Sequence, residues 1–146
     1  ILGCSDSRVP PEVIFDQGLG DLYVVRVAGN VLDQMIVASI EYAVLHLNVA
    51  LIMVMGHSQC GAVAATCTHE QLEGHLPSLT FALNHALNSA KGKKGDLVEN
   101  VTKDNAINVA QELCQTGAHF PELVENNKLT IVPAYYHLGT GKVDLL

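Results

Sequence analysis

The apolar run at residues 50–55 (ALIMVM) constrains the fold of this chain more than any other stretch. It has the length of a strand and no polar residue, which is typical of a parallel strand covered on both faces. Apolar side chains at intervals of three and four predict an amphipathic helix over residues 33–46. Residues 22–27 are rich in β-branched and aromatic side chains and predict an earlier strand. Together they form a βαβ unit with a right-handed crossover.

The rest of the chain extends this pattern to one α/β domain over residues 1–146. The expected sheet is mostly parallel and four-stranded, flanked by helices, with a candidate fifth strand at its edge. The remaining strands are predicted at residues 1–4 and 128–136, and at 142–146 for the edge strand. The remaining helices are predicted at residues 62–70, 76–90 and 97–116.

Composition limits what such a domain can do. With 146 residues the chain can bury a substantial core, so a bound metal is free to serve a function rather than stability. Hydrophobic residues make up 49% and charged residues 16%, which favours a buried subunit interface and therefore a homo-oligomer. The net charge of −7, without a basic stripe, argues against nucleic acid as a partner.

A membrane-bound or secreted protein is also not expected. No apolar stretch reaches the roughly 18 residues of a membrane span, and no basic-then-apolar leader is visible. The chain opens without Met, already inside an apolar strand, so we expect a helical N-terminal segment to precede it. Its four cysteines are better explained as reduced thiols and metal ligands than as disulfides, and a cytoplasmic location is expected.

Two short motifs follow predicted strands and carry metal-binding side chains. His57 and Cys60 lie three residues apart, directly after the apolar run, and Cys4 follows the first strand. Because the carboxyl ends of parallel strands meet at one edge of a sheet, these three should converge. Two thiolates and one imidazole suit zinc and leave its fourth tetrahedral position open, whereas a structural site usually has a fourth protein ligand. The prediction is one catalytic Zn²⁺ per chain.

Asp6 and Arg8 lie beside the first of these cysteines. Two thiolates neutralise the charge of zinc, so a nearby carboxylate that accepts a hydrogen from the bound water would help to orient it. Arg8 can hold Asp6 ionised through a bidentate pair. The alternative is an exposed ion pair of little energetic value. Cys67 and Cys114 are expected to be small core residues rather than ligands.

These residues resemble the β-class carbonic anhydrases over nearly the whole chain. The resemblance is carried, in order, by residues 4–8 (CSDSR), 26–30 (RVAGN) and 56–61 (GHSQCG), and by Tyr136 with residues 140–143 (TGKV). It implies a zinc hydro-lyase that reversibly hydrates carbon dioxide to bicarbonate and a proton, working as a homodimer or a dimer of dimers.

The resemblance also implies a role for each matching residue. Cys4, His57 and Cys60 would bind zinc, and zinc-bound hydroxide would be the nucleophile. Asp6 and Arg8 would form the catalytic dyad, and in some members the equivalent of Asp6 moves onto zinc as a fourth ligand. Val9 and Gly61 would lie near the carbon dioxide pocket.

The chain departs from the family pattern in three places. Ala62 stands where the family commonly has a second glycine, which is a mild change. Members with a non-catalytic bicarbonate pocket use a tryptophan, and this chain has none, so that pocket is expected to be absent. The family's N-terminal helix, which embraces the partner subunit, has no counterpart in residues 1–146.

Other functions are compatible with the same motifs. The site could hydrolyse carbonyl sulfide or carbon disulfide, because zinc hydroxide attacks any linear heterocumulene. A non-catalytic zinc or oligomerisation module would retain the fold, but it would have no need of Asp6 and Arg8. Reversible disulfide formation between Cys4 and Cys60 would instead make the chain a redox sensor.

Overall fold

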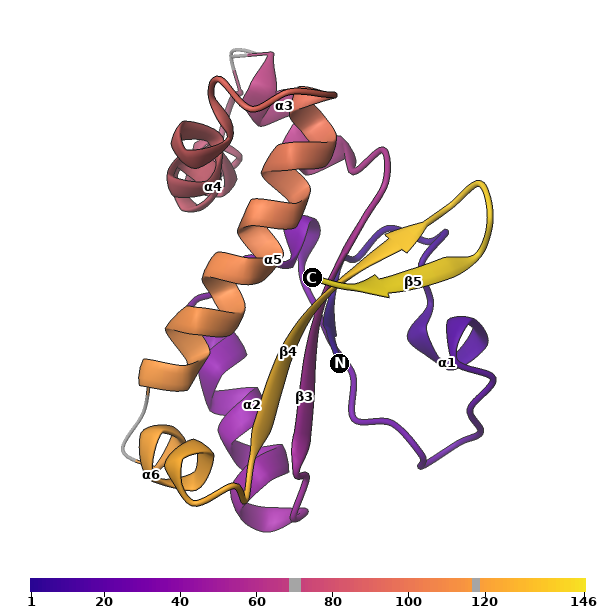
Figure 1. The fold of residues 1–146 in the computed structure, drawn as a ribbon, viewed down its shortest axis with the longest axis vertical. Helices are drawn as coiled ribbons and strands as arrows, with labels where there is room; N and C mark the ends of the chain where they lie inside the picture. Colours follow the sequence, from indigo (N-terminus) through magenta and orange to yellow (C-terminus); the bar gives the residue numbers. More distant parts are fainter. Residues whose placement is uncertain (69–71, 117–118) are drawn as a thin grey trace.

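The computed structural model describes residues 1–68, 72–116 and 119–146, and it contains a five-stranded sheet in the order β2-β1-β3-β4-β5 (Figure 1). The first four strands in space are parallel, and the last is antiparallel to its neighbour. The predicted fold class is confirmed, including the fifth strand at the edge. The strands are β1 (Leu2–Gly3), β2 (Val25–Arg26), β3 (Leu51–His57), β4 (Thr130–His137) and β5 (Lys142–Leu145).

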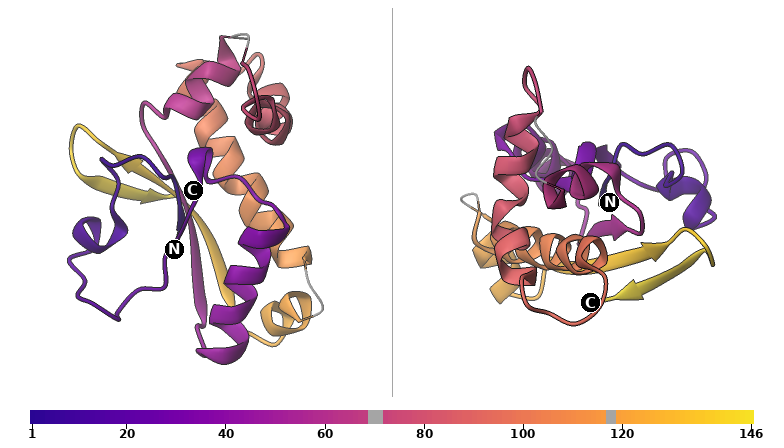
Figure 2. Two further views of the ribbon diagram at one scale, coloured as in Figure 1. Left: turned by 180° about the vertical axis from the view of Figure 1, so that it is seen from behind. Right: turned by 90° about the horizontal axis from the view of Figure 1, so that it is seen from above.

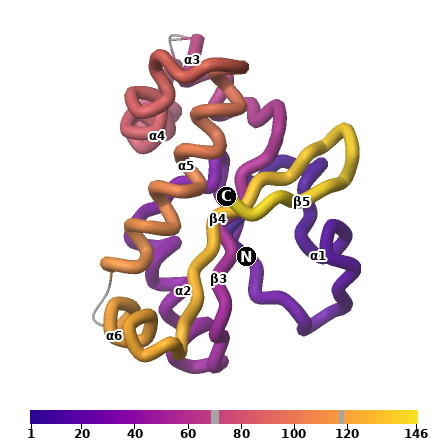
Figure 3. The backbone as a smooth tube through the Cα atoms, in the orientation of Figure 1, coloured from indigo at the N-terminus to yellow at the C-terminus, as the bar shows by residue number. Residues whose placement is uncertain are grey.

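Helices cover the sheet unevenly. Figures 1 and 2 show α2, α5 and α6 along one face, whereas α1 lies on the other side. The tube in Figure 3 shows how the segment between β1 and β2 loops away from the sheet there. The helices are α1 (Pro11–Ile14), α2 (Gln34–His46), α3 (Gly61–Cys67), α4 (Pro77–Ala90), α5 (Leu97–Gln115) and α6 (Phe120–Glu125), with a 3₁₀ turn, η1 (Ala28–Asn30).

Several predicted boundaries were wrong. The strand expected at residues 22–27 contains only β2, because β1 offers just two residues for pairing. The strand expected at residues 50–55 runs on to His57, since Gly56 and His57 still pair with Tyr135 and Tyr136 of β4. The helix expected at residues 62–70 ends at Cys67 where it is described, and residues 69–70 lie outside the described residues.

Two hydrophobic clusters form the core. The first lies between the sheet and the helices α2, α5 and α6, and Ile52 and Val54 contribute to it from β3. The second contains Cys4 and Cys60 themselves, together with Val9, Val63, Leu83, Leu87 and Val101. The metal-binding motifs are therefore part of the second core cluster. Within the described part of the chain, no helix combines the length and apolar character that crossing a membrane requires.

Ion pairs and caps fix the ends of the long helices. Asp33 accepts a hydrogen bond from the Ile36 amide at the start of α2, and Asp96 caps α5 in the same way. The lysine-rich loop before α5 (residues 91–95) is held in part by an ion pair with that helix. There Lys93 Nζ lies 2.6 and 2.8 Å from the two carboxylate oxygens of Asp104, which is buried.

Helix α5 packs directly against the sheet at Gly56. A Cβ atom placed on Gly56 would lie 2.7 Å from Thr102 Cγ2 and 3.1 Å from the Thr102 carbonyl oxygen. Any side chain at this position would push α5 away from β3, because protein interiors are close-packed. Glycine therefore allows α5 to lie directly against the strand residue that precedes His57.

We expect the substitution Gly56→Ala to lower the free energy of unfolding by about 1–3 kcal/mol, because the added methyl overpacks the contact with α5. Urea denaturation followed by circular dichroism measures the change. Thr102→Ser, which removes the methyl group that clashes, should restore part of the loss in the double variant. Gly139→Ala is the matched control, since nothing lies within 4 Å of its added Cβ. Equal stability of the two alanine variants would contradict the prediction.

Candidate metal centre

Cys4, His57 and Cys60 come together at one edge of the sheet. Cys4 follows β1, His57 is the last residue of β3, and Cys60 precedes the first residue of α3. β1 and β3 are adjacent and parallel, so their carboxyl ends present these side chains on the same side. The ligand atoms of the three residues all lie within 4.8 Å of one another, and all three residues are buried.

The positions of the two sulfur atoms suit zinc. Cys4 Sγ and Cys60 Sγ are 4.0 Å apart. A tetrahedral zinc ion with zinc–sulfur bonds of about 2.3 Å holds two sulfurs about 3.8 Å apart. The pair therefore already has the spacing that zinc coordination requires, and a small adjustment is enough.

The imidazole of His57 is oriented for ligation through Nε2. Its Nδ1 lies 2.9 Å from the Ser58 carbonyl oxygen, and because a carbonyl only accepts, Nδ1 carries the hydrogen. That tautomer leaves a free lone pair on Nε2. Nε2 is buried and has no hydrogen-bond partner among the described residues. A backbone carbonyl on the second ring nitrogen is the usual support of a metal-bound histidine.

The turn between His57 and Cys60 is held by the neighbouring strand. The Ser58 amide donates to the Tyr136 carbonyl oxygen at 2.9 Å, and Ser58 Oγ accepts from the Leu138 amide at 2.9 Å. Gln59 adopts a left-handed conformation with φ of 57°, which allows the chain to reverse before α3. The end of β4 therefore fixes the geometry of the two ligands at positions 57 and 60.

The two thiols are within hydrogen-bonding distance of each other. The hydrogen bond from Cys60 lowers the pKa of the Cys4 thiol well below its usual value, and it raises the pKa of Cys60. The Gly29 amide also donates to Cys4 Sγ, at 3.3 Å. Both contacts favour the thiolate form of Cys4, and a cation between the sulfurs would favour loss of both protons.

Asp6 and Arg8 form a bidentate ion pair beside the ligands. Arg8 Nε donates to Asp6 Oδ1 at 3.0 Å and Arg8 Nη2 donates to Asp6 Oδ2 at 2.7 Å. Arg8 Nη2 also donates to the Gln59 carbonyl oxygen at 3.1 Å, which links the loop after β1 to the turn after β3. These hydrogen bonds hold the pKa of Asp6 well below its usual range, so its carboxylate is ionised.

The other two predicted site residues also lie beside the ligands. Val9 is buried and packs in the same hydrophobic cluster as Cys4 and Cys60. Gly61 is the first residue of α3, and the space where its side chain would be is open. Ala62 belongs to the edge of that cluster. The role of Val9 and Gly61 in a substrate pocket stays a prediction.

Two residues of the site were not assigned a role from the sequence. Arg26 Nε donates to the Cys4 carbonyl oxygen at 2.8 Å, and its Nη2 donates to the Asp6 carbonyl oxygen, so it holds the main chain of the loop. Gly29 supplies the amide that reaches Cys4 Sγ. These contacts involve backbone atoms and join residues 20 or more positions apart, so residue spacing does not predict them.

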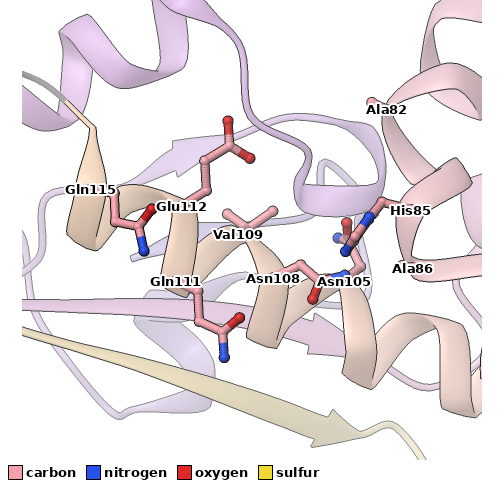
Figure 4. A pocket seen from close by; sticks show the side chains of 9 residues that line it. All are labelled: Ala82, His85, Ala86, Asn105, Asn108, Val109, Gln111, Glu112 and Gln115. Carbon is pink, nitrogen blue, oxygen red and sulfur yellow. The ribbon is translucent and has the colours of Figure 1, made fainter. Parts of the chain in front are cut away.

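A cleft beside α5 is separate from this centre. A cavity of about 370 Å³ opens between α4 and α5 (Figure 4), and none of the three ligands lines it. Its wall is mostly polar and is formed by Ala82, His85, Ala86, Asn105, Asn108, Val109, Gln111, Glu112 and Gln115.

Comparisons with known proteins agree with this geometry. The family model described as carbonic anhydrase matches residues 1–143. Carbonic anhydrase 2 of Mycobacterium tuberculosis is 65% identical over 150 residues, an alignment that covers 99% of this chain and 72% of the relative.

Solved structures give the same answer for the fold. Two tetrameric β-carbonic anhydrases from the filamentous ascomycete Sordaria macrospora superpose with a TM-score of 0.88 at 26% identity, covering 99% of this chain and 78% of that chain. A Coccomyxa β-carbonic anhydrase in complex with acetazolamide also has a TM-score of 0.88 at 26% identity, covering 99% and 69%. The chain belongs to the carbonic anhydrase family, and to its β class.

Proposed function

We propose that Cys4, His57 and Cys60 bind one zinc ion per chain, and that Asp6 and Arg8 serve that site in the reversible hydration of carbon dioxide to bicarbonate and a proton. The observation that carries the proposal is the buried Nε2 of His57, which has no hydrogen-bond partner in the described part of the chain and lies beside a sulfur pair with the spacing that zinc requires. When bound, zinc supplies a Lewis acid that lowers the pKa of a coordinated water.

Asp6 would hold and orient the hydrogen of the reacting water. Its carboxylate is ionised and can only accept a hydrogen, so a water beside it would point one O–H at Asp6, which leaves its oxygen lone pairs free to face a substrate. Arg8 contacts both carboxylate oxygens and the Gln59 carbonyl, which fixes the direction of the carboxylate. Since both oxygens are engaged by Arg8, Asp6 would have to leave this pair before it could bind metal itself.

The apolar cluster around the ligands would favour an uncharged substrate. Val9 is buried against the cluster that holds both cysteines, and Gly61 leaves open space beside Cys60. Carbon dioxide loses little hydration on entering such surroundings, whereas bicarbonate is charged and is better solvated outside. We therefore assign Val9 and Gly61 to the wall of the carbon dioxide pocket.

We also propose that residues 1–146 form one catalytic domain that assembles as a homodimer or a dimer of dimers in the cytoplasm. Exposed apolar side chains support an interface, among them Met35, Phe81 and Leu145. All four cysteines are free thiols, as a reducing compartment would keep them. Size-exclusion chromatography with light scattering gives the mass of the assembly, and cell fractionation gives its location.

The function is tested by removing one ligand. We expect Cys60→Ser to abolish stoichiometric zinc binding and carbon dioxide hydration while the fold still forms, because a core of this size does not depend on the metal. Zinc content is measured by plasma emission spectrometry and hydration by stopped flow. Cys114→Ser, on α5, is the control and should keep both. Chelation of zinc from the wild type should also abolish hydration, and full activity without zinc would refute the proposal.

The substrate is tested by comparing gases on one preparation. The wild-type protein should turn over carbon dioxide far faster than carbonyl sulfide or carbon disulfide. The reverse order would assign the same centre to hydrolysis of the sulfur compounds.

The ion pair makes a prediction about pH. We expect Arg8→Gln to raise the pKa of Asp6 toward its ordinary value of about 4, because the bonds that favour the carboxylate are lost. The folded-state pKa in the wild type is depressed, so the pair stabilises the fold above the unfolded pKa and this contribution disappears as the pH falls below about 4. Carboxyl-carbon NMR measures the pKa, with Asp6→Asn to assign the resonance. Lys142→Gln should leave that pKa unchanged; an equally low value in Arg8→Gln would contradict the prediction.

A further inference from the structure

We infer that Asn105 on α5 is a positioning residue of the metal centre, which holds the Gly29 peptide so that its amide stays on Cys4 Sγ. The inference rests on the zinc site proposed above and extends it to a helix that carries none of the ligands. Its basis is a pair of hydrogen bonds that meet at one residue.

Gly29 is held from both sides. Its amide donates to Cys4 Sγ at 3.3 Å, and its carbonyl oxygen accepts from Asn105 Nδ2 at 3.0 Å. The residue has a left-handed backbone with φ of 69°, inside the turn η1. The amide of the peptide unit before Gly29 and the carbonyl of the one after it are thus each held by one of these two bonds, and rotation of the turn would break both.

The turn around Gly29 is also held by its own backbone and by apolar packing. The Asn30 amide donates to the Val27 carbonyl oxygen at 3.0 Å. A Cβ on Gly29 would lie 3.4 Å from Ala62 Cβ and 3.5 Å from Leu83 Cδ1, so apolar groups press on the turn from α3 and α4. Asn105 is the residue that donates to the Gly29 carbonyl among the described residues, and only 3% of Asn105 is exposed. A buried amide that has found such a partner is costly to remove.

Helix α5 is itself held in place near the centre, so Asn105 can fix the position of this turn. Thr102, one helical turn before Asn105, lies against Gly56 of β3, next to the ligand His57. Asp104, which adjoins Asn105, is pinned by Lys93. The same face of α5 therefore contacts both the strand that ends in His57 and the turn that supports Cys4.

The chemical consequence concerns the sulfur of Cys4. An N–H group that donates to a metal-bound thiolate withdraws electron density from the sulfur and fixes its direction. Loss of a partner in direct contact with a ligand typically weakens metal binding by 10–100-fold. Asn105 is one hydrogen bond further from the metal, so we expect its loss to weaken zinc binding by about tenfold or less.

The test compares Asn105→Leu and Asn105→Asp with the same two changes at Asn108. In Figure 4 both asparagines lie on α5, at the wall of the cavity. Asn108 is the matched control because its Nδ2 is also buried but has no hydrogen-bond partner among the described residues. Asn105→Asp keeps the shape of the side chain and removes the donor, so it decides the question if Asn105→Leu does not fold.

Three readouts on the full-length protein report on the centre without using activity. These are zinc affinity by chelator competition, the thiolate-to-cobalt absorption band of the cobalt-loaded protein, and hydrogen exchange of the Gly29 amide. We expect the Asn105 variants to bind zinc about three- to tenfold more weakly, to shift the cobalt band and to exchange Gly29 faster. The Asn108 variants should match the wild type in all three.

A merely structural role for Asn105 would leave the cobalt band of the fully loaded protein in place. Wild-type affinity and an unshifted band in both Asn105 variants would overturn the inference while leaving the zinc site intact. Equal effects at Asn105 and Asn108 would overturn it as well. Failure of the wild-type protein to bind zinc at all would instead refute the proposed function.

Discussion

The parallel pairing of β1 with β3 is the contact on which the rest of this structure depends. It joins only two residues of β1, yet it aligns Gly3 with Met55 and so brings Cys4, the next residue, alongside the end of β3. His57 then reaches the same sheet edge, and the turn to α3 adds Cys60. Since the carboxyl ends of parallel strands share one edge, ligands more than 50 residues apart in sequence occupy one site.

Burial gives this centre its chemical character. The sulfur atoms lie in a hydrophobic cluster, where a charged thiolate is costly unless it is hydrogen-bonded or bound to a cation. The Gly29 amide offsets part of this cost by donating to Cys4 Sγ, and a bound metal would offset the rest. Asp6 and Arg8 lie at the exposed rim of the same cluster, so their ion pair can face solvent while it remains beside the buried ligands.

Much of the site could be predicted because the residue types and their spacing indicate metal binding and ion pairing. The spacing of His57 and Cys60 behind an apolar strand, with Cys4 behind another, was enough to place three ligands together, and the structure brings them within reach of one ion. The bidentate pair of Asp6 and Arg8 also followed from local spacing. The contacts that Arg26 and Asn105 make to backbone carbonyls were not predicted. Every residue has a backbone carbonyl, so the sequence does not show which of them will accept a side-chain hydrogen bond.

The sequence by itself determined the α/β class, the order of the elements and which residues are the candidate metal ligands, since periodicity and residue chemistry are local properties. Tertiary structure decided the rest: that β2 is two residues long, that β3 extends to His57, and that α5 lies directly on Gly56. Those outcomes depend on how closely distant segments can pack, and close packing is a property of the assembled core rather than of any one stretch of chain.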